Sequence, residues 1–84
     1  MYRLRLKRTA EADLDRLPRP LFDRINEHIL ALREEPRPAG VRKLQGGVEG
    51  WRILVGDYRV VYQIDDGART VTIVRVRHRR DVYR

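Results

Sequence analysis

The sequence contains no cysteine and only two histidines, His28 and His78. The absence of cysteine excludes disulfide bonds, a thiolate nucleophile and the cysteine-ligated zinc and iron–sulfur centres. The two histidines stand 50 positions apart, which is not the spacing of a histidine metal site. We therefore expect a protein without a metal ion or a cofactor.

Long apolar stretches are also missing. The longest unbroken apolar run is Ile29–Leu32, far shorter than the ~20 residues of a membrane-spanning helix. The first residues, Met-Tyr-Arg-Leu-Arg-Leu-Lys-Arg, lack the apolar segment of a secretory signal. The sequence therefore predicts a cytoplasmic protein that does not associate with a membrane.

The chain is short, with 84 residues, so residues 1–84 are expected to form one domain. A chain of this length buries only roughly 60–65% of the surface that it exposes when unfolded. The composition, 42% apolar and 37% charged, is nevertheless that of a globular protein. We expect a small core that no disulfide or metal stabilises.

Positive charge is abundant: 19 basic residues stand against 12 acidic ones, and all the basic residues except Lys7 and Lys43 are arginines. Arginine binds phosphate through a planar, two-pronged group of donors. The region between Thr9 and Pro36 has more acidic than basic residues, whereas residues 75–80 contain four arginines and a histidine. This asymmetry predicts a polyanionic partner that contacts one face of the molecule.

The first half of the chain has the pattern of one strand followed by two helices. Apolar and basic residues alternate over residues 2–7, as in a half-buried strand. Thr9 can cap a short helix that Pro18 interrupts. Pro20 suits the first turn of a second helix, whose apolar residues recur every three or four positions up to Leu32.

The second half has the pattern of strands and tight turns. Strands are predicted at residues 41–44, 51–55, 58–64 and 70–76, with turns at Gly56-Asp57 and Asp65-Asp66-Gly67. Residues 79–84 fit either a strand end or a short helical turn. The fold class is therefore α+β: one twisted antiparallel sheet, with a two-helix hairpin packed on one face.

Alternation assigns each strand residue to a face of this sheet. The residues expected to face the helices are Leu4, Leu6, Leu14, Leu17, Ile25, Ile29, Leu32, Ile53, Val60, Tyr62 and Ile64. The opposite, open face should carry Arg3, Arg5, Arg52, Arg59, Arg75 and Arg77. The fold thus predicts a cationic sheet face.

Four stretches then resemble one protein family. They are Lys43-Leu44-Gln45-Gly46, Trp51-Arg52-Ile53, Tyr58-Arg59-Val60-Val61-Tyr62-Gln63-Ile64 and His78-Arg79-Arg80-Asp81-Val82-Tyr83. Their order and spacing resemble the RelE/ParE superfamily of toxins from toxin–antitoxin pairs. The resemblance implies the same sheet-and-helices fold. It also implies one of two activities: RelE-type toxins cut mRNA in the ribosomal A site, and ParE-type toxins inhibit DNA gyrase without being enzymes.

The resemblance to RelE-type toxins assigns roles to three residues. Arg59 matches the strand arginine that contacts the scissile phosphate, and Arg79 matches a second catalytic arginine that stabilises charge on the phosphorus. Tyr83 matches the terminal tyrosine that orients the cleaved nucleotide. ParE-type toxins commonly lack the pairing of Arg79 with Tyr83, so this pairing favours a metal-independent endoribonuclease in which the 2′-hydroxyl attacks the phosphate.

The resemblance does not identify which residue is the general base of such an enzyme. Arg52 matches a basic position of the family, but an arginine is a poor proton shuttle because its pKa stays above ~12. The family's second basic position is occupied here by Leu54. His78 is a candidate, although alternation places it opposite Arg79, so it is either a catalytic base or a partly buried hydrogen-bonding residue.

The remaining predictions concern binding partners. The cations expected to bind RNA are Lys43, Arg75, Arg77 and Arg80. The resemblance implies a cognate antitoxin whose acidic residues meet the arginine-rich face, and operator DNA that the pair binds through the antitoxin. The ribosome and its mRNA are the expected targets, and DNA gyrase is the alternative.

Overall fold

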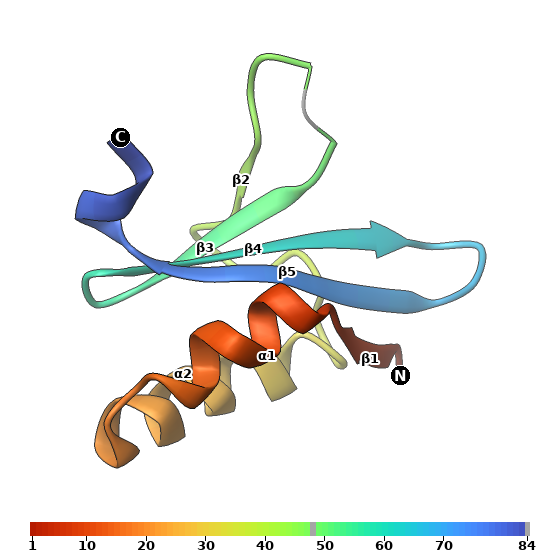
Figure 1. Ribbon diagram of the computed structural model, residues 1–84. Helices are drawn as coiled ribbons and strands as arrows, with labels where there is room; N and C mark the ends of the chain where they lie inside the picture. The colour runs from red at the N-terminus through yellow and green to blue at the C-terminus, as the bar shows by residue number, and fades with distance from the viewer. Residues whose placement is uncertain (48, 84) are drawn as a thin grey trace.

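The computed structural model describes residues 1–47 and 49–83, including their side chains except those of Val82 and Tyr83. A five-stranded sheet carries two helices on one face (Figure 1). In chain order the elements are β1 (Arg3–Leu6), α1 (Arg8–Asp15), α2 (Arg19–Ala31), β2 (Arg42–Lys43), β3 (Trp51–Val55), β4 (Tyr58–Asp65), β5 (Thr70–His78) and the 3-10 helix η1 (Arg79–Tyr83). The predicted α+β fold is confirmed.

The sheet has the order β1-β5-β4-β3-β2. Strands β2 to β5 pair in antiparallel fashion, as the short turns between β3, β4 and β5 predict. The prediction of a purely antiparallel sheet is wrong for β1, which pairs in parallel with β5. Alternation reports which face of a strand is buried, and it does not report the direction of a neighbour that is more than sixty residues away in the sequence.

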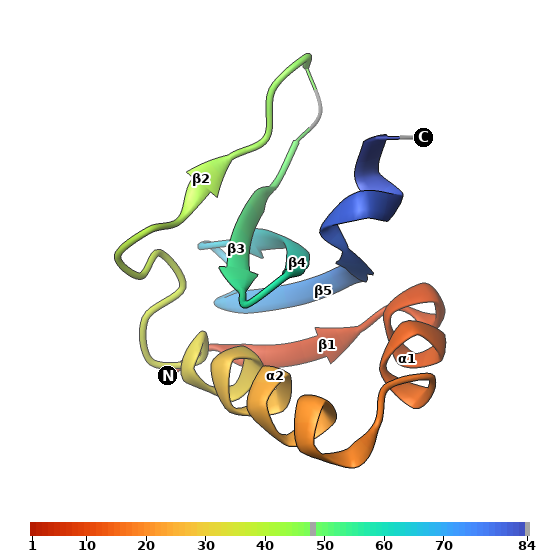
Figure 2. The same ribbon diagram turned by 90° about the vertical axis from the view of Figure 1, so that its left-hand side faces the viewer.

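The two faces of the sheet are covered differently. Both views show α1 and α2 on one side, whereas η1 and the connection from β2 to β3 rise on the other (Figures 1 and 2). On that side, the part of the sheet between η1 and the β2–β3 connection has no helix over it among the described residues. None of the described helices is long and apolar enough to cross a membrane.

The core lies between the helices and the sheet. Most of the residues predicted to face inward are buried, among them Ile25 and Ile29 of α2 and Val60 and Tyr62 of β4. Leu6 is an exception, with 39% of its surface exposed. It ends a strand at the edge of the sheet, so no further strand covers it.

A β-bulge breaks the alternation of β5. Val61 pairs with Arg75 and Tyr62 pairs with Ile73, so β5 has one extra residue at this point. The side chains of Ile73 and Val76 are therefore both buried although they stand three positions apart. Beyond the bulge, the edge of β5 is covered by α1, where the Thr9 hydroxyl donates to the carbonyl oxygen of Val74 at 2.7 Å. Thr9 is therefore not the predicted N-cap, because Lys7 precedes the helix.

Tyr62 anchors the end of α2 to the sheet. Its ring is fully buried and its hydroxyl donates to the carbonyl oxygen of Pro36 at 2.7 Å. Burial raises the pKa of Tyr62 to about 12, from an ordinary value of 10.0. A buried neutral phenol thus joins the proline-rich segment after α2 to the central strand.

Tyr62→Phe should change the alkaline stability of the protein. Between pH 10 and about 12 the unfolded chain loses the Tyr62 proton and the folded chain keeps it. The free energy of unfolding therefore falls as the pH rises through this window. We expect urea titrations to show a smaller fall in Tyr62→Phe, which also loses about 1 kcal/mol at pH 7 with its hydrogen bond. If the free energy of unfolding falls with pH as steeply in Tyr62→Phe as in the wild type, the raised pKa of Tyr62 is contradicted.

Candidate functional site

The open face of the sheet carries a row of residues centred on Arg59. In the strand register Arg59 lies opposite Leu54 of β3 and Arg77 of β5. Its neighbour Val60 is buried in the core, so Arg59 points to the other side. Arg52 lies two positions before Leu54 and shares this face. The predicted placement of Arg52, Arg59 and Arg77 is therefore confirmed.

Arg59 has an unusual environment for a charged side chain. Its Nε atom is buried and has no hydrogen-bond partner among the described residues. A buried donor that is left without an acceptor costs free energy. Arg59 therefore keeps an unpaired donor among the described residues, on a sheet face that carries other cations.

Arg79 lies beside the turn that precedes β4. Its backbone N–H donates to the carbonyl oxygen of Asp57 at 2.7 Å. Its guanidinium is 4.0 Å from the Asp57 carboxylate, and both side chains are 69% exposed. An exposed ion pair at this distance contributes little stability. The guanidinium of Arg79 is therefore only weakly held by Asp57.

Tyr83 is the last residue of η1, which rises on the open side of the sheet (Figure 1). Its side chain lies outside the described residues. The predicted contact between Tyr83 and a nucleotide stays a prediction.

His78 lies on the other side of the sheet from Arg59. It pairs with Tyr58 in the register, two positions after the buried Val76, and its ring packs edge-on against Tyr58 with 5.2 Å between ring centres. Its Nδ1 accepts the backbone N–H of Arg80 at 3.2 Å. The structure does not bring His78 to Arg59, and its contacts are those of a hydrogen-bonding residue that fixes the start of η1.

Two His78 variants separate this hydrogen bond from the ring. The Oδ1 of an asparagine can take the place of Nδ1, whereas a leucine offers no acceptor. We expect the Arg80 amide to exchange with solvent about five- to tenfold faster in His78→Leu, because the bond contributes about 1 kcal/mol. His78→Asn should keep most of the protection. Equal exchange in the two variants would contradict a positioning role.

Three of the four predicted RNA-binding cations, Arg75, Arg77 and Arg80, line one cavity, and Lys43 is not among its lining residues. Arg77 lies on the open face, and Arg80 is exposed on η1. Lys43 lies elsewhere, with its Nζ 5.8 Å from the ring centre of Trp51. Arg75 lies opposite Val61, two positions before Arg77, so the bulge gives it the parity of the open face, but its guanidinium is held by Asp13 of α1 at 3.0 Å.

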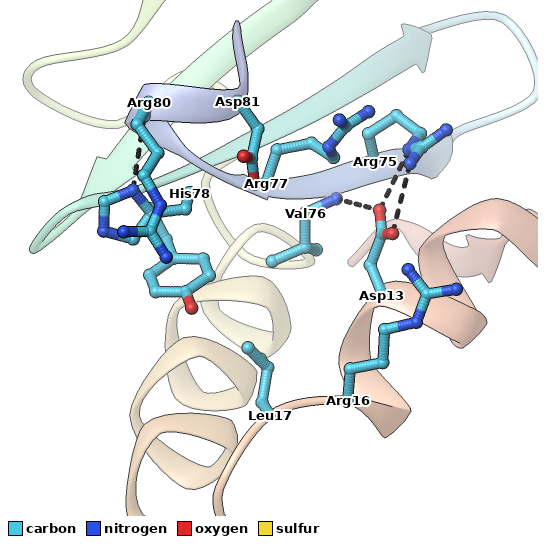
Figure 3. Close-up of a pocket in the computed structure, with 10 residues that line it drawn as sticks. Asp13, Arg16, Leu17, Arg75, Val76, Arg77, His78, Arg80 and Asp81 are labelled. Atoms are coloured by element: carbon cyan, nitrogen blue, oxygen red, sulfur yellow. Dashed lines mark hydrogen bonds and ion pairs between the residues drawn. The ribbon is translucent and has the colours of Figure 1, made fainter.

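Asp13 is the residue that the sequence-based reasoning missed. It is only 7% exposed, and its carboxylate accepts two hydrogen bonds from Arg75 and one from the backbone N–H of Val76 at 2.9 Å (Figure 3). The carboxylate thereby accepts a backbone N–H at the edge of β5 that would otherwise need the carbonyl oxygen of a neighbouring strand. The available signal was its spacing from Ala10 and Leu14, which places an acidic side chain on the apolar face of α1.

Comparison with protein families gives one match over nearly the whole chain. The model of the ParE toxin of the type II toxin–antitoxin system parDE matches residues 4–83.

Two curated toxins of Mycobacterium tuberculosis are similar over nearly all of this chain. Toxin RelG is 39% identical over 87 residues, which cover 99% of this chain and 97% of that protein. Toxin RelE is 36% identical over 85 residues, which cover 99% of this chain and 87% of that protein.

Solved structures show the same fold. The toxin–antitoxin complex RelBE2 of M. tuberculosis contains a chain that is 34% identical, with a TM-score of 0.82 over 93% of this chain and 98% of that one. A chain of the archaeal RelE–RelB complex from Pyrococcus horikoshii is 29% identical, with a TM-score of 0.81 over 93% and 94% of the two chains.

Proposed function

This chain belongs to the RelE/ParE family of type II toxin–antitoxin toxins, and from that membership we propose that it is a ribosome-dependent endoribonuclease that cuts mRNA in the A site. The observation that carries the proposal is the buried, unpartnered Nε of Arg59 on an open cationic sheet face. The similarity to toxins named RelG and RelE supports the ribonuclease branch.

The proposed reaction breaks one phosphodiester bond without a metal ion. The 2′-hydroxyl loses its proton and its oxygen bonds to the adjacent phosphorus. The bond from phosphorus to the 5′-oxygen then breaks, and that oxygen takes up a proton. The products are a 2′,3′-cyclic phosphate and a free 5′-hydroxyl.

The arginines of the open face act on the phosphate during this reaction. Arg59 donates to a nonbridging oxygen, and its donors need no reorganisation because the sheet already holds them. Arg79 turns from Asp57 to the phosphate and stabilises the charge that develops on the phosphorane. Arg52 holds the RNA backbone on the same face, and Tyr83 orients the nucleotide so that attack occurs in line.

Leu54 explains why the ribosome would be required. It stands opposite Arg59 with 54% of its surface exposed, at a position where the family pattern has a basic residue. The row around Arg59 thus supplies cations that bind phosphate but no lysine that exchanges a proton near neutral pH. We infer that positioning of the mRNA by the ribosome supplies much of the rate enhancement.

An antitoxin is the proposed protein partner, and it would link the toxin to operator DNA. The related chains from M. tuberculosis and P. horikoshii were both solved in complexes with an antitoxin. With a net charge of +7, this chain favours a partner with acidic side chains over the open face. Action on ribosomes places the toxin in the cytoplasm.

Inhibition of DNA gyrase is the second candidate function. The match to the ParE toxin model favours it, and so does Leu54 in place of a second basic residue. Under this reading the open face binds a protein, and Arg59 and Arg79 have no catalytic role.

One experiment separates the two functions. The purified chain is added to ribosomes that hold a defined mRNA with a vacant A site, and the mRNA ends are mapped by primer extension. We expect a new end within the A-site codon, no cleavage of naked mRNA, and strong loss of cleavage in Arg79→Ala and Tyr83→Ala. An uncut message together with inhibited supercoiling by gyrase would overturn the ribonuclease proposal.

A further inference from the structure

A cavity of about 290 Å³ opens where the end of α1, the last residues of β5 and η1 meet (Figure 3). Leu17, Tyr58 and Val76 form the apolar and aromatic part of its wall. The other lining residues are Asp13, Arg16, Arg75, Arg77, His78, Arg80 and Asp81. The cavity therefore combines an apolar surface with charged groups from three separate elements.

The charges around this cavity do not cancel. Arg75 and Asp13 are committed to each other. Among the described residues, the remaining cations Arg16, Arg77 and Arg80 have no ion pair, and Asp81 is the one acidic side chain left in the lining. The excess is two positive charges when His78 is neutral. A phosphate monoester carries about −1.5 to −2 at pH 7, and a carboxylate carries only half of that.

The arrangement of the side chains also suits a nucleotide. Figure 3 shows Arg80 beside His78 at one end of the cavity and Arg16 near Asp13 at the other, with Arg77 between them. Guanidinium groups bind phosphate oxygens with two parallel donors. The rings of Tyr58 and His78, packed edge-on with 5.2 Å between ring centres, offer an aromatic face to a nucleotide base.

We propose that this cavity, which shares Arg77 with the row around Arg59, is a second site that binds the phosphate group of a nucleotide, either free or within an RNA chain. Arg16 and Leu17 at the end of α1 line the cavity together with Arg77 of β5 and Arg80 of η1, so the cavity lies at the edge of the sheet. Arg77 lines the cavity and also lies opposite Arg59, so an RNA chain held at Arg59 can continue into it. The site does not depend on cleavage by the open face.

The test measures binding to the full chain without ribosomes. Adenosine 5′-monophosphate and inorganic phosphate are titrated separately while the Nε–Hε signals of the arginines are followed by NMR. We expect saturable shifts at Arg16 and Arg80, and at least tenfold weaker binding in Arg16→Glu and in Arg80→Glu. Arg8→Glu, which makes the same charge change at the opposite end of α1, should bind as the wild type does.

Two further arms identify the source of the phosphate. If a short 2′-O-methyl RNA displaces the nucleotide, the site belongs to RNA, and Arg16→Glu should lower the slope of log affinity against log salt by about 1. If the RNA does not compete, the site takes a free nucleotide.

Shifts that never saturate would overturn the proposal. So would tighter binding of a glutamate-rich peptide at Arg16 and Arg80, which would assign the cavity to an acidic protein partner. All these readouts measure binding without cleavage. They would therefore be the same if the ribonuclease proposal failed.

Discussion

We expect Arg59→Leu to lose about 10²–10³-fold in the rate of mRNA cleavage and to become more stable at the same time. The rate falls because the substitution removes a preorganised donor to the phosphate. The stability rises by about 1 kcal/mol because the substitution removes a buried Nε that has no acceptor in the free protein. Leucine fills this position, opposite Leu54, with an apolar side chain.

The two effects are measured separately. Cleavage is followed on ribosomes in excess toxin, and the free energy of unfolding comes from urea titration. Arg3→Leu is a matched control, because Arg3 is an exposed arginine of strand β1 at the far edge of the same sheet. It should change both quantities much less. If Arg59→Leu is both inactive and less stable, Arg59 is a structural residue and the proposed phosphate contact is wrong.

Opposite changes in activity and stability would show that the open face is held in a state that favours its ligand. The three cations Arg52, Arg59 and Arg77 share this face, where they repel one another in the absence of an anion. An antitoxin with acidic side chains would relieve the same repulsion. The free energy that an anion recovers at Arg59 is therefore available both to the substrate and to the inhibitor.

The placement of Arg52 and Arg59 could be read from the sequence because it rests on local rules. Alternation in β3 and β4 requires only that Ile53, Val60 and Tyr62 face the core, and the arginines between them then face outward. The apolar stripe of α2, with Ile25 and Ile29, fixes which face of the sheet is covered. Each of these predictions depends on residues a few positions apart.

The features that were missed depend on distant contacts. The extra residue in β5 is visible only once β4 is paired with it, and no local pattern identifies Asp13 of α1 as the partner of Arg75. The parallel pairing of β1 depends on a partner strand at the other end of the chain. Alternation also placed His78 with Val76, away from Arg59, but no local pattern identifies Tyr58 as the neighbour of its ring.

Asp13→Ala should be the most destabilising single substitution near the candidate site, at about 3 kcal/mol. The change leaves the backbone N–H of Val76 without an acceptor and Arg75 without its carboxylate. A domain of this size has a total stability of only roughly 4–12 kcal/mol. The variant should therefore unfold at a much lower urea concentration, while the dependence of its free energy of unfolding on urea concentration stays unchanged.

Two comparisons tell what the carboxylate contributes. Asp13→Asn keeps an oxygen for the N–H of Val76 and should lose about half as much stability as Asp13→Ala. Thr9→Ala, which removes the other hydrogen bond between α1 and the edge of β5, should lose about 1 kcal/mol.

A double-mutant cycle then isolates the pair of Asp13 and Arg75. We expect Asp13→Ala to be clearly less damaging when Arg75 is already alanine, because no partly buried guanidinium is then left unpaired. Strict additivity would mean that Asp13 acts only through the N–H of Val76. In either case α1 closes the edge of β5 next to Arg77, so loosening this contact should also disturb the strand that presents Arg77 to the open face and leads into Arg79 at the start of η1.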